Sequence, residues 1–439
     1  MTNIIWVRRI VRWLSIALLV VATIFSWHNQ VSRFDPEFRS PFDELHHFDY
    51  WWRIYKQKTV PEVYDRIQHE SVAIWCGYGA NLEVNPECKQ AKSGPTLLEN
   101  RASNYQPTFY VATAAMAWVL EVFMDTDNAF HLVKLANLVW GLISVVLVAW
   151  LALVLGVPIW LTAVLVFAVG QTPAFVFAAI TLNQEMFVLL FCLMGLIWYV
   201  QRTAAANIRQ FAIQTGLIAG ICLTIKPTAL LLPVAIVVAE LLNFSQAGTV
   251  RLKRVFGFSL ITLVVYALIS FGCDLLRGVN PSDGRLRDYL LARGEHDFLT
   301  WASHVWTSFA RSTASFHWRR LVDWDLPLLF MWFYPLVMTA LVVVLIYLLI
   351  AKVKGFRPSL ASRLFLGVIV ACVTLPAALG VYLLFSDIPY FFQQRYYTAY
   401  ILIAVVLAVA FIEGLVGESA FICYSKWRGV MRRRERHPS

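Results

Sequence analysis

The sequence predicts an all-α polytopic membrane protein, and three of its features support that fold class. Apolar residues make up 59% of the 439 residues and charged residues only 15%, whereas a soluble domain carries about 25% charged residues to keep its surface wetted. The apolar residues come in runs of about 20, the length with which a helix crosses ~30 Å of hydrocarbon. These runs lack the alternation of a membrane β-barrel, so helices must satisfy the backbone within lipid.

Ten apolar runs are expected to span the bilayer. The first, at about residues 10–28, follows three arginines and lacks a small-residue cleavage site, so we interpret it as an anchor rather than a signal peptide. The others lie at about 131–154, 158–180, 184–200, 207–224, 228–243, 255–273, 326–350, 362–385 and 397–416.

The apolar segment from Pro107 to Met124 decides the topology, because counting it as a span would give eleven crossings. With ten crossings, the N-terminus, three basic clusters between spans and the basic tail all fall on the cytoplasmic side, as the positive-inside rule requires. We therefore expect a helix at 107–124 on the outer membrane face and both termini in the cytoplasm. Because most lysines and arginines serve as topology signals, the net charge of +10 gives no reason to expect nucleic-acid binding.

The predicted organisation has six parts, with a large first external loop that carries membrane-surface helices. These parts are a cytoplasmic N-terminus and first span (1–28), the first external loop (29–130), central spans (131–273), a second external loop (274–325), C-terminal spans (326–416) and a basic cytoplasmic tail (417–439).

An acidic pair, Asp43 and Glu44, precedes an aromatic run in the first external loop. Desolvation and mutual repulsion should raise the pKa of at least one of these carboxyl groups. Such a group could accept a proton near neutral pH as a general base. The alternative is an ordinary helix start, where the helix dipole favours acids.

Three further charged residues lie near the outer ends of predicted spans. Glu185 follows a short turn, and a carboxylate at that depth is costly unless it is paired or functional; a helix-start acid is the alternative. Lys226, in Lys226-Pro227-Thr228, opposes the positive-inside trend, so it is a candidate for binding an anion or for snorkelling to lipid phosphates. Arg395, among aromatic residues, could hold a phosphate with its planar fork of donors.

These motifs together resemble the GT-C glycosyltransferase superfamily, and the resemblance covers most of the chain. The sequence Phe42-Asp43-Glu44-Leu45-His46-His47-Phe48 resembles the Asp-Glu-x-His-Phe motif of protein O-mannosyltransferases. The whole chain is more similar to a large family of bacterial polytopic proteins within the superfamily. Its further motifs match Asn104-Tyr105-Gln106-Pro107-Thr108-Phe109-Tyr110, Asn183-Gln184-Glu185, Lys226-Pro227-Thr228 and Gln393-Gln394-Arg395-Tyr396. Two positions depart from the pattern, Thr108 in place of a second proline and Glu185 where Asp is commoner.

The resemblance implies a GT-C fold in the bacterial inner membrane and transfer of a sugar, with inversion, at the external face. The donor would be a polyprenyl-phosphate sugar and the acceptor a glycan, a glycolipid or a protein. Asp43 would act as the base and Glu44 would orient the acceptor. Lys226 and Arg395 would bind the donor phosphate, and Glu185 would orient Lys226 or bind donor hydroxyls. The expected donor- and acceptor-binding residues also include Asn104, Gln106, Tyr110, Tyr396 and His47.

Other assignments stay open at this point. A lipid-linked glycan flippase or transporter would use the same cations without needing the acidic pair, and a polysaccharide ligase would move a whole glycan. His46, His47 and His69 near the acids leave a divalent metal ion open as a cofactor, although adjacent helical residues point about 100° apart. A disulfide between Cys76 and Cys88 would close a short loop in an oxidising periplasm.

Overall fold

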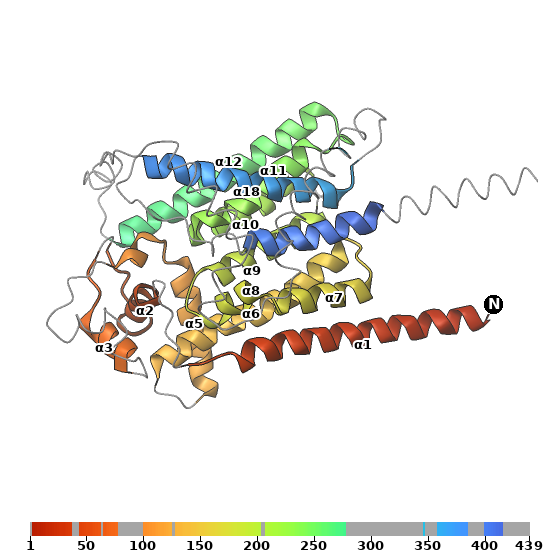
Figure 1. Cartoon of the computed structure of the whole chain (residues 1–439). Helices are drawn as coiled ribbons and strands as arrows, with labels where there is room; N and C mark the ends of the chain where they lie inside the picture. The colour runs from red at the N-terminus through yellow and green to blue at the C-terminus, as the bar shows by residue number, and fades with distance from the viewer. Residues whose placement is uncertain are drawn as a thin grey trace, which may run out of the picture.

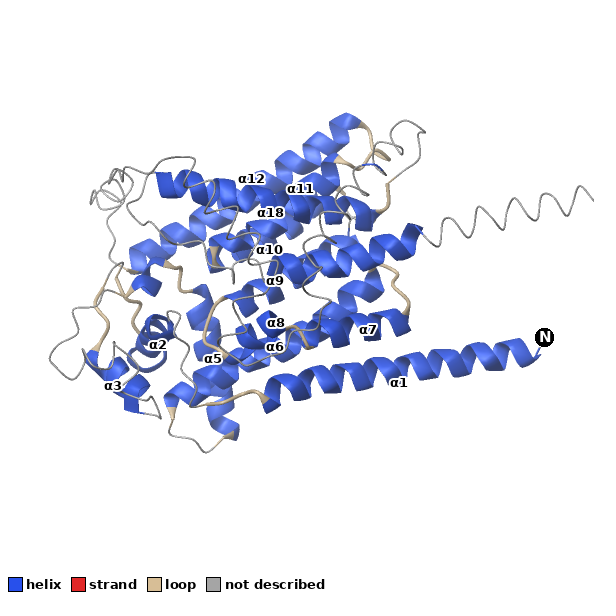
Figure 2. Cartoon of the chain, viewed as in Figure 1, coloured by secondary structure: helices blue, strands red, loops and turns tan. Residues whose placement is uncertain are grey.

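The computed structural model describes residues 2–36, 44–62, 65–77, 100–124, 128–202, 207–277, 346, 358–384 and 399–415. All elements in these ranges are helices, as Figure 2 shows. The predicted all-α class is therefore confirmed. The predictions for the second external loop beyond Arg277, for most of the span 326–350 and for the tail 417–439 lie outside the described residues.

Five helices among the described residues are long and apolar enough to cross a membrane, and a bent pair, α7 and α8, adds a sixth if it counts as one span. The five are α1 (Thr2–Ser32), α6 (Ala129–Val154), α9 (Glu185–Arg202), α10 (Ile208–Ile225) and α12 (Gly248–Leu276). Shorter apolar helices occur at Thr108–Phe123, Thr228–Leu241, Leu360–Cys372 and Ala399–Leu415. The chain thus has the helices of a membrane protein, while the number ten stays a prediction.

The span expected at 158–180 consists of two helices. α7 (Ile159–Gly170) and α8 (Pro173–Ile180) are bent by 64° at the break between them. Thr172 has an extended backbone (φ −67°, ψ 122°), as expected for a residue that precedes proline, because the proline ring disfavours the helical conformation there. The bend ends α7 at Gly170, and α8 packs against α6.

The helices pack in neighbouring pairs, with α1 against α7, α6 against α9, α10 against α12, and α11 (Leu231–Leu241) against α18 (Leu360–Leu384). Small residues allow these approaches. A Cβ on Gly216 of α10 would lie 2.7 Å from Cγ2 of Ile261, and one on Gly220 would lie 2.7 Å from Cβ of Val265. Because residues four apart share one helix face, the two glycines form a close contact with α12.

One end of the bundle carries the first-loop helices. α2 (Glu44–Trp52), the π-helix η1 (Arg53–Gln57), α3 (His69–Gly77) and α5 (Thr108–Phe123) gather at the end away from the N-terminus of α1 (Figure 1). α5 is the helix predicted at 107–124, and its Val122 and Phe123 are 80% and 81% exposed. Its place on the outer membrane face stays a prediction.

Candidate functional site

The centre of the candidate site is a buried ion pair between two helix ends. Glu185 is the first residue of α9, and Lys226 follows the last residue of α10. The Lys226 ammonium donates to Oε1 of Glu185, and the two residues are 4% and 1% exposed. Glu185 was expected either to orient Lys226 or to bind donor hydroxyls, and its contact with Lys226 is present in the structure.

The turn before α9 is held by two asparagines. Asn183 accepts from the Glu185 backbone N–H with its Oδ1 at 2.9 Å, which caps the start of the helix. Asn137 of α6 donates its Nδ2 to the carbonyls of Ala178 and Thr181 at 2.9 and 2.7 Å. Helix ends leave carbonyls without intrahelical partners, so Asn137 fixes the end of α8 and thereby the position of the turn. Sequence reasoning did not single out Asn137.

Glu44 connects α2 to that same turn. Its Oε1 accepts from the Leu182 backbone N–H at 2.9 Å, and the residue is 1% exposed. The contact joins positions 138 residues apart in the chain. Glu44, Glu185 and Lys226 therefore come together around the turn before α9.

Aromatic side chains of α2 and α5 line this junction. The hydroxyl of Tyr110 lies 2.7 Å from Nδ1 of His47 and accepts from Nε2 of Gln184 at 3.1 Å. Because Gln184 donates to the Tyr110 oxygen, Tyr110 can donate its own proton to His47. The ring of Tyr50 stacks on Tyr110 with 3.9 Å between centroids. This contact helps to hold Tyr110 between His47 and Gln184.

Arg277, one residue beyond the last residue of α12, is a second cation at the junction. Its Nη2 donates to the Tyr50 hydroxyl at 2.6 Å and to the carbonyl of Tyr105, and the residue is 3% exposed. Lys226 lies over the ring of the same Tyr105, 5.5 Å from its centroid. Burial raises the pKa of Tyr50 to about 12, with Arg277 opposing the shift. Sequence reasoning missed Arg277, although a basic residue directly after an apolar run, on the side predicted to be external, resembles the signal that identified Lys226.

Asp49 holds the first loop together next to the site. Its carboxylate pairs with Arg53 at 3.1 Å and accepts from the Gln68 backbone N–H at 3.0 Å and from Nδ2 of Asn100 at 2.7 Å. Desolvation by burial raises the pKa of Asp49, while these partners and Ser71 oppose the rise. The i,i+4 spacing of Asp49 and Arg53 was a signal in the sequence that could have identified this pair.

Of the predicted site residues, the structure brings together Glu44, His47, Tyr110, Glu185 and Lys226. Gln106 follows Tyr105 and is partly buried. Asn104 ends the 3-10 helix η2 (Arg101–Asn104), and its side chain lies outside the described part of the chain. Asp43, Arg395 and Tyr396 also lie outside the described residues.

The predictions of a metal ion and of a disulfide fall only partly within the described residues. Within the described ranges, no group of three or more His, Cys, Asp or Glu could hold a metal ion. His46 and His47 are adjacent residues of α2, so their rings point in different directions from the helix. Nδ1 of His47 also contacts the Tyr110 hydroxyl, so it is not open to a metal ion. Cys76 is disulfide-bonded, while its predicted partner Cys88 lies outside the described residues.

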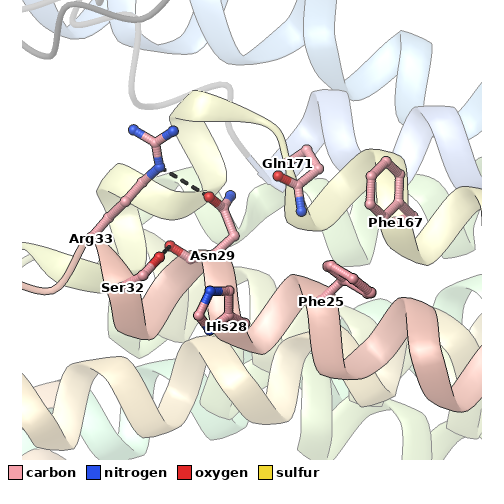
Figure 3. A pocket seen from close by; sticks show the side chains of 7 residues that line it. All are labelled: Phe25, His28, Asn29, Ser32, Arg33, Phe167 and Gln171. Carbon is pink, nitrogen blue, oxygen red and sulfur yellow. Dashed lines mark hydrogen bonds between the residues drawn. The ribbon is translucent and has the colours of Figure 1, made fainter.

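A separate groove of about 430 Å³ lies between α1 and α7. Figure 3 shows its lining, with Phe25 and Phe167 at one side and Asn29, Arg33 and Gln171 at the other. Arg33 donates from Nε to Oδ1 of Asn29 at 2.9 Å. The groove shares no residue with the Glu185–Lys226 junction, and in the sequence α8 lies between Gln171 and the turn before Glu185.

Comparisons with protein-family models, with curated proteins and with solved structures find no match to this chain.

Proposed function

We propose that the protein is a membrane glycosyltransferase that moves a sugar from a polyprenyl-phosphate donor to a cell-envelope acceptor at the external face, with inversion. The observation that supports this proposal is the junction itself. Segments from α2, α5, α9, α10 and α12 meet at one end of the bundle and bring together carboxylates, an imidazole and two cations. Buried charges are costly in a membrane protein, so their collection at one place favours a functional site.

The reaction would be a single in-line displacement. Asp43, the residue before Glu44, would accept the proton of an acceptor hydroxyl. The hydroxyl oxygen would form a bond to the anomeric carbon as the bond from that carbon to the phosphate oxygen breaks. The electron pair would leave on the lipid phosphate, and fixed positive charge would stabilise it there.

The cations for this step are Lys226 and Arg277, with Arg395 as the third that the resemblance implies. Lys226 lies over the ring of Tyr105, and Arg277 donates to the backbone carbonyl of the same residue. Glu44 would position the acceptor side, because its contact with Leu182 ties α2 to the turn that carries Glu185. His47 would be held in one orientation by Tyr110.

The position of the junction favours this reaction over transport. Glu185 is the first residue of α9, and Lys226 directly follows α10, so both lie at helix ends. A transporter would bind its substrate near the bilayer midplane, commonly at broken helices. The end of the broken pair α7–α8 is held by Asn137, whose side chain donates to the carbonyls of Ala178 and Thr181.

The test compares cell-envelope glycans, by mass spectrometry, from a deletion strain and from strains carrying the wild-type chain or Asp43→Asn. We expect one sugar to be lost on deletion and Asp43→Asn to lower transfer about 10²- to 10⁴-fold, the usual contribution of a positioned base. Glu70→Gln, an exposed acid on α3, is the matched control and should keep normal transfer. Normal glycans with Asp43→Asn would remove Asp43 as the base, and normal glycans in the deletion strain would overturn the function.

A further inference from the structure

The groove between α1 and α7 has an apolar part and a polar part (Figure 3). The rings of Phe25 and Phe167, which are 54% and 47% exposed, form the apolar part. The polar part contains Asn29, Arg33 and Gln171. The volume of about 430 Å³ lies within the range of about 300–1,000 Å³ that ligand sites occupy, so the groove has room for part of a ligand as large as a lipid.

The groove is formed where the two helices touch. The Ser26 hydroxyl lies 3.1 Å from the carbonyl oxygen of Val166, and a Cβ on Gly170 would clash with the Ser26 side chain. About one turn later on α1, Asn29 donates from Nδ2 to the carbonyl of Gly170 at 3.1 Å. The oxygen of the same amide accepts from Nε of Arg33 at 2.9 Å. Asn29 therefore ties Arg33 to the last residue of α7 and gives the guanidinium a defined place at the groove.

The distance between the two parts matches the surface of a bilayer. The segment Arg9–Ser32 of α1 is long and apolar enough to cross a membrane, and Arg33 follows it directly. Arg33 comes eight residues after Phe25, which corresponds to about 12 Å along a helix. The headgroup region on each side of the hydrocarbon is only about 5–8 Å thick. A guanidinium at the depth of the headgroups therefore places Phe25 among the lipid chains.

The charge of the lining favours an anion. Its basic residues are His28 and Arg33, and no acidic residue lines the groove among the described parts of the chain. The planar guanidinium of arginine matches the oxygens of a phosphate, whereas an ammonium or choline group would meet only positive charge here. A water-soluble phosphate would leave the two phenylalanines without an apolar partner. A phospholipid with an anionic headgroup satisfies both parts of the groove.

We infer that the groove between α1 and α7 binds one phospholipid with an anionic headgroup, such as phosphatidylglycerol. The lipid phosphate binds Arg33, and the hydroxyl groups of the head reach Gln171. One acyl chain lies between Phe25 and Phe167, so the bound lipid holds the end of α1 against α7. The inference is independent of the proposed transfer reaction, because the groove shares no residue with the candidate site.

Native mass spectrometry of the purified chain, in detergent micelles, tests the inference because it counts the lipids bound to each protein. Dioleoyl phosphatidylglycerol is titrated first, and dioleoyl phosphatidylcholine, whose head carries a positive charge, is titrated second. Arg33→Gln removes the cation of the groove. Arg12→Gln is the matched control, since Arg12 is an exposed arginine of the same helix and does not line the groove.

A second pair of variants tests the apolar part. Phe167→Ala removes one aromatic wall of the groove, and Trp160→Ala is its control, because Trp160 is a 51% exposed aromatic residue of α7 outside the groove. Arg33 and Phe167 are both exposed, so their replacement should leave the chain folded. The melting temperature of each variant without added lipid checks this.

We expect one phosphatidylglycerol to remain bound to the wild-type chain and phosphatidylcholine to bind about 5-fold more weakly or less. Arg33→Gln should weaken phosphatidylglycerol binding about 5- to 10-fold, the value of one arginine that meets a lipid phosphate. Phe167→Ala should weaken the binding of both lipids about 2- to 5-fold, because less apolar surface is buried. The two control variants should stay within about 2-fold of the wild-type chain.

Three results would overturn the site. Equal binding of the two lipids by the wild-type chain would remove the preference for an anion. Equal losses with Arg33→Gln and Arg12→Gln would mean that any exposed arginine of α1 attracts the lipid. Complete displacement of phosphatidylglycerol by an equimolar amount of undecaprenyl phosphate would assign the groove to a polyprenyl lipid instead of a phospholipid.

Discussion

Two buried ion pairs lie toward opposite ends of the helix bundle, and they differ in what surrounds them. At the near end, the end that carries α2, Glu185 pairs with Lys226 at the first residue of α9. At the far end, Glu240 of α11 accepts from the hydroxyl of Tyr199 at 2.8 Å and lies 3.6 Å from Arg254. Tyr199 is fourteen residues after Glu185 on α9, a separation of about 21 Å.

Both ends contain buried side-chain atoms that lack a hydrogen-bond partner among the described residues, for example Oε1 of Gln184 and Nε of Arg277 at the near end and the Nε groups of Arg251 and Arg363 at the far end. The far-end arginines have a structural task, because Arg363 and Arg251 donate to the carbonyls of Ala239 and Leu241 at the end of α11. Cations at a helix C-terminus are stabilising. The far-end cations therefore stabilise the end of α11, whereas at the near end Lys226 and Arg277 both contact Tyr105.

Removing the cation from each pair should give the largest difference between the two ends. Lys226→Met leaves the Glu185 carboxylate buried without its cation, which costs about 3–5 kcal/mol of unfolding free energy. Arg254→Met should cost less, about 1–3 kcal/mol, because Tyr199 still donates to Glu240. Both are measured by equilibrium unfolding in mixed detergent micelles.

The double variant Glu185→Gln/Lys226→Met is the control for the near end. It removes both charges together, so most of the stability lost in Lys226→Met should return. Equal losses for Lys226→Met and Arg254→Met would contradict the difference that we assign to the two ends.

A second pair of variants compares arginines from the two ends of α12. Arg277→Gln loses bonds to the Tyr50 hydroxyl and the Tyr105 carbonyl, and we expect a loss of about 2 kcal/mol because bonds to a charged group are the stronger ones. Arg251→Gln removes a partly exposed cap of α11 and should cost less than about 1 kcal/mol. Hydrogen exchange should show faster opening of α2 only with Arg277→Gln, and protection of α2 in both variants would disprove the anchoring role.

The sequence predicted the residues of the near end better than the bonds that position them. Glu185 and Lys226 were identifiable because charge is rare in apolar runs, and their pairing follows from the topology. Asn137 was not identifiable, because its partners are the carbonyls of Ala178 and Thr181, which are free only once α8 ends. Pro173 marked a weak point in the span 158–180, but prolines are tolerated in membrane helices where neighbours satisfy the freed backbone.

The same reason explains the other omissions. Arg277 and Asp49 owe their roles to Tyr105 and Asn100, residues far from them in the sequence. Local patterns state which side chains are unusual, while long-range packing decides which of them meet. Asp43, the residue on which the proposed base depends, lies outside the described residues and stays a prediction.

The smallest predicted effect concerns Asp49, a near-end acid whose oxygens are bonded to Arg53, Gln68 and Asn100. Burial raises its pKa from the ordinary 3.8, so the folded chain binds this proton more tightly than the unfolded chain. The stability from this proton is fully present below pH 3.8 and is lost as the pH rises through the raised pKa. Relative to Asp49→Asn, the wild-type chain should therefore lose at most about 1.4 kcal/mol per pH unit in that window and then level off.

Arg53→Gln sharpens the measurement, because the Arg53 charge holds the pKa of Asp49 down. Without it, the decline in stability should move to higher pH, and an unmoved decline would show that another group titrates.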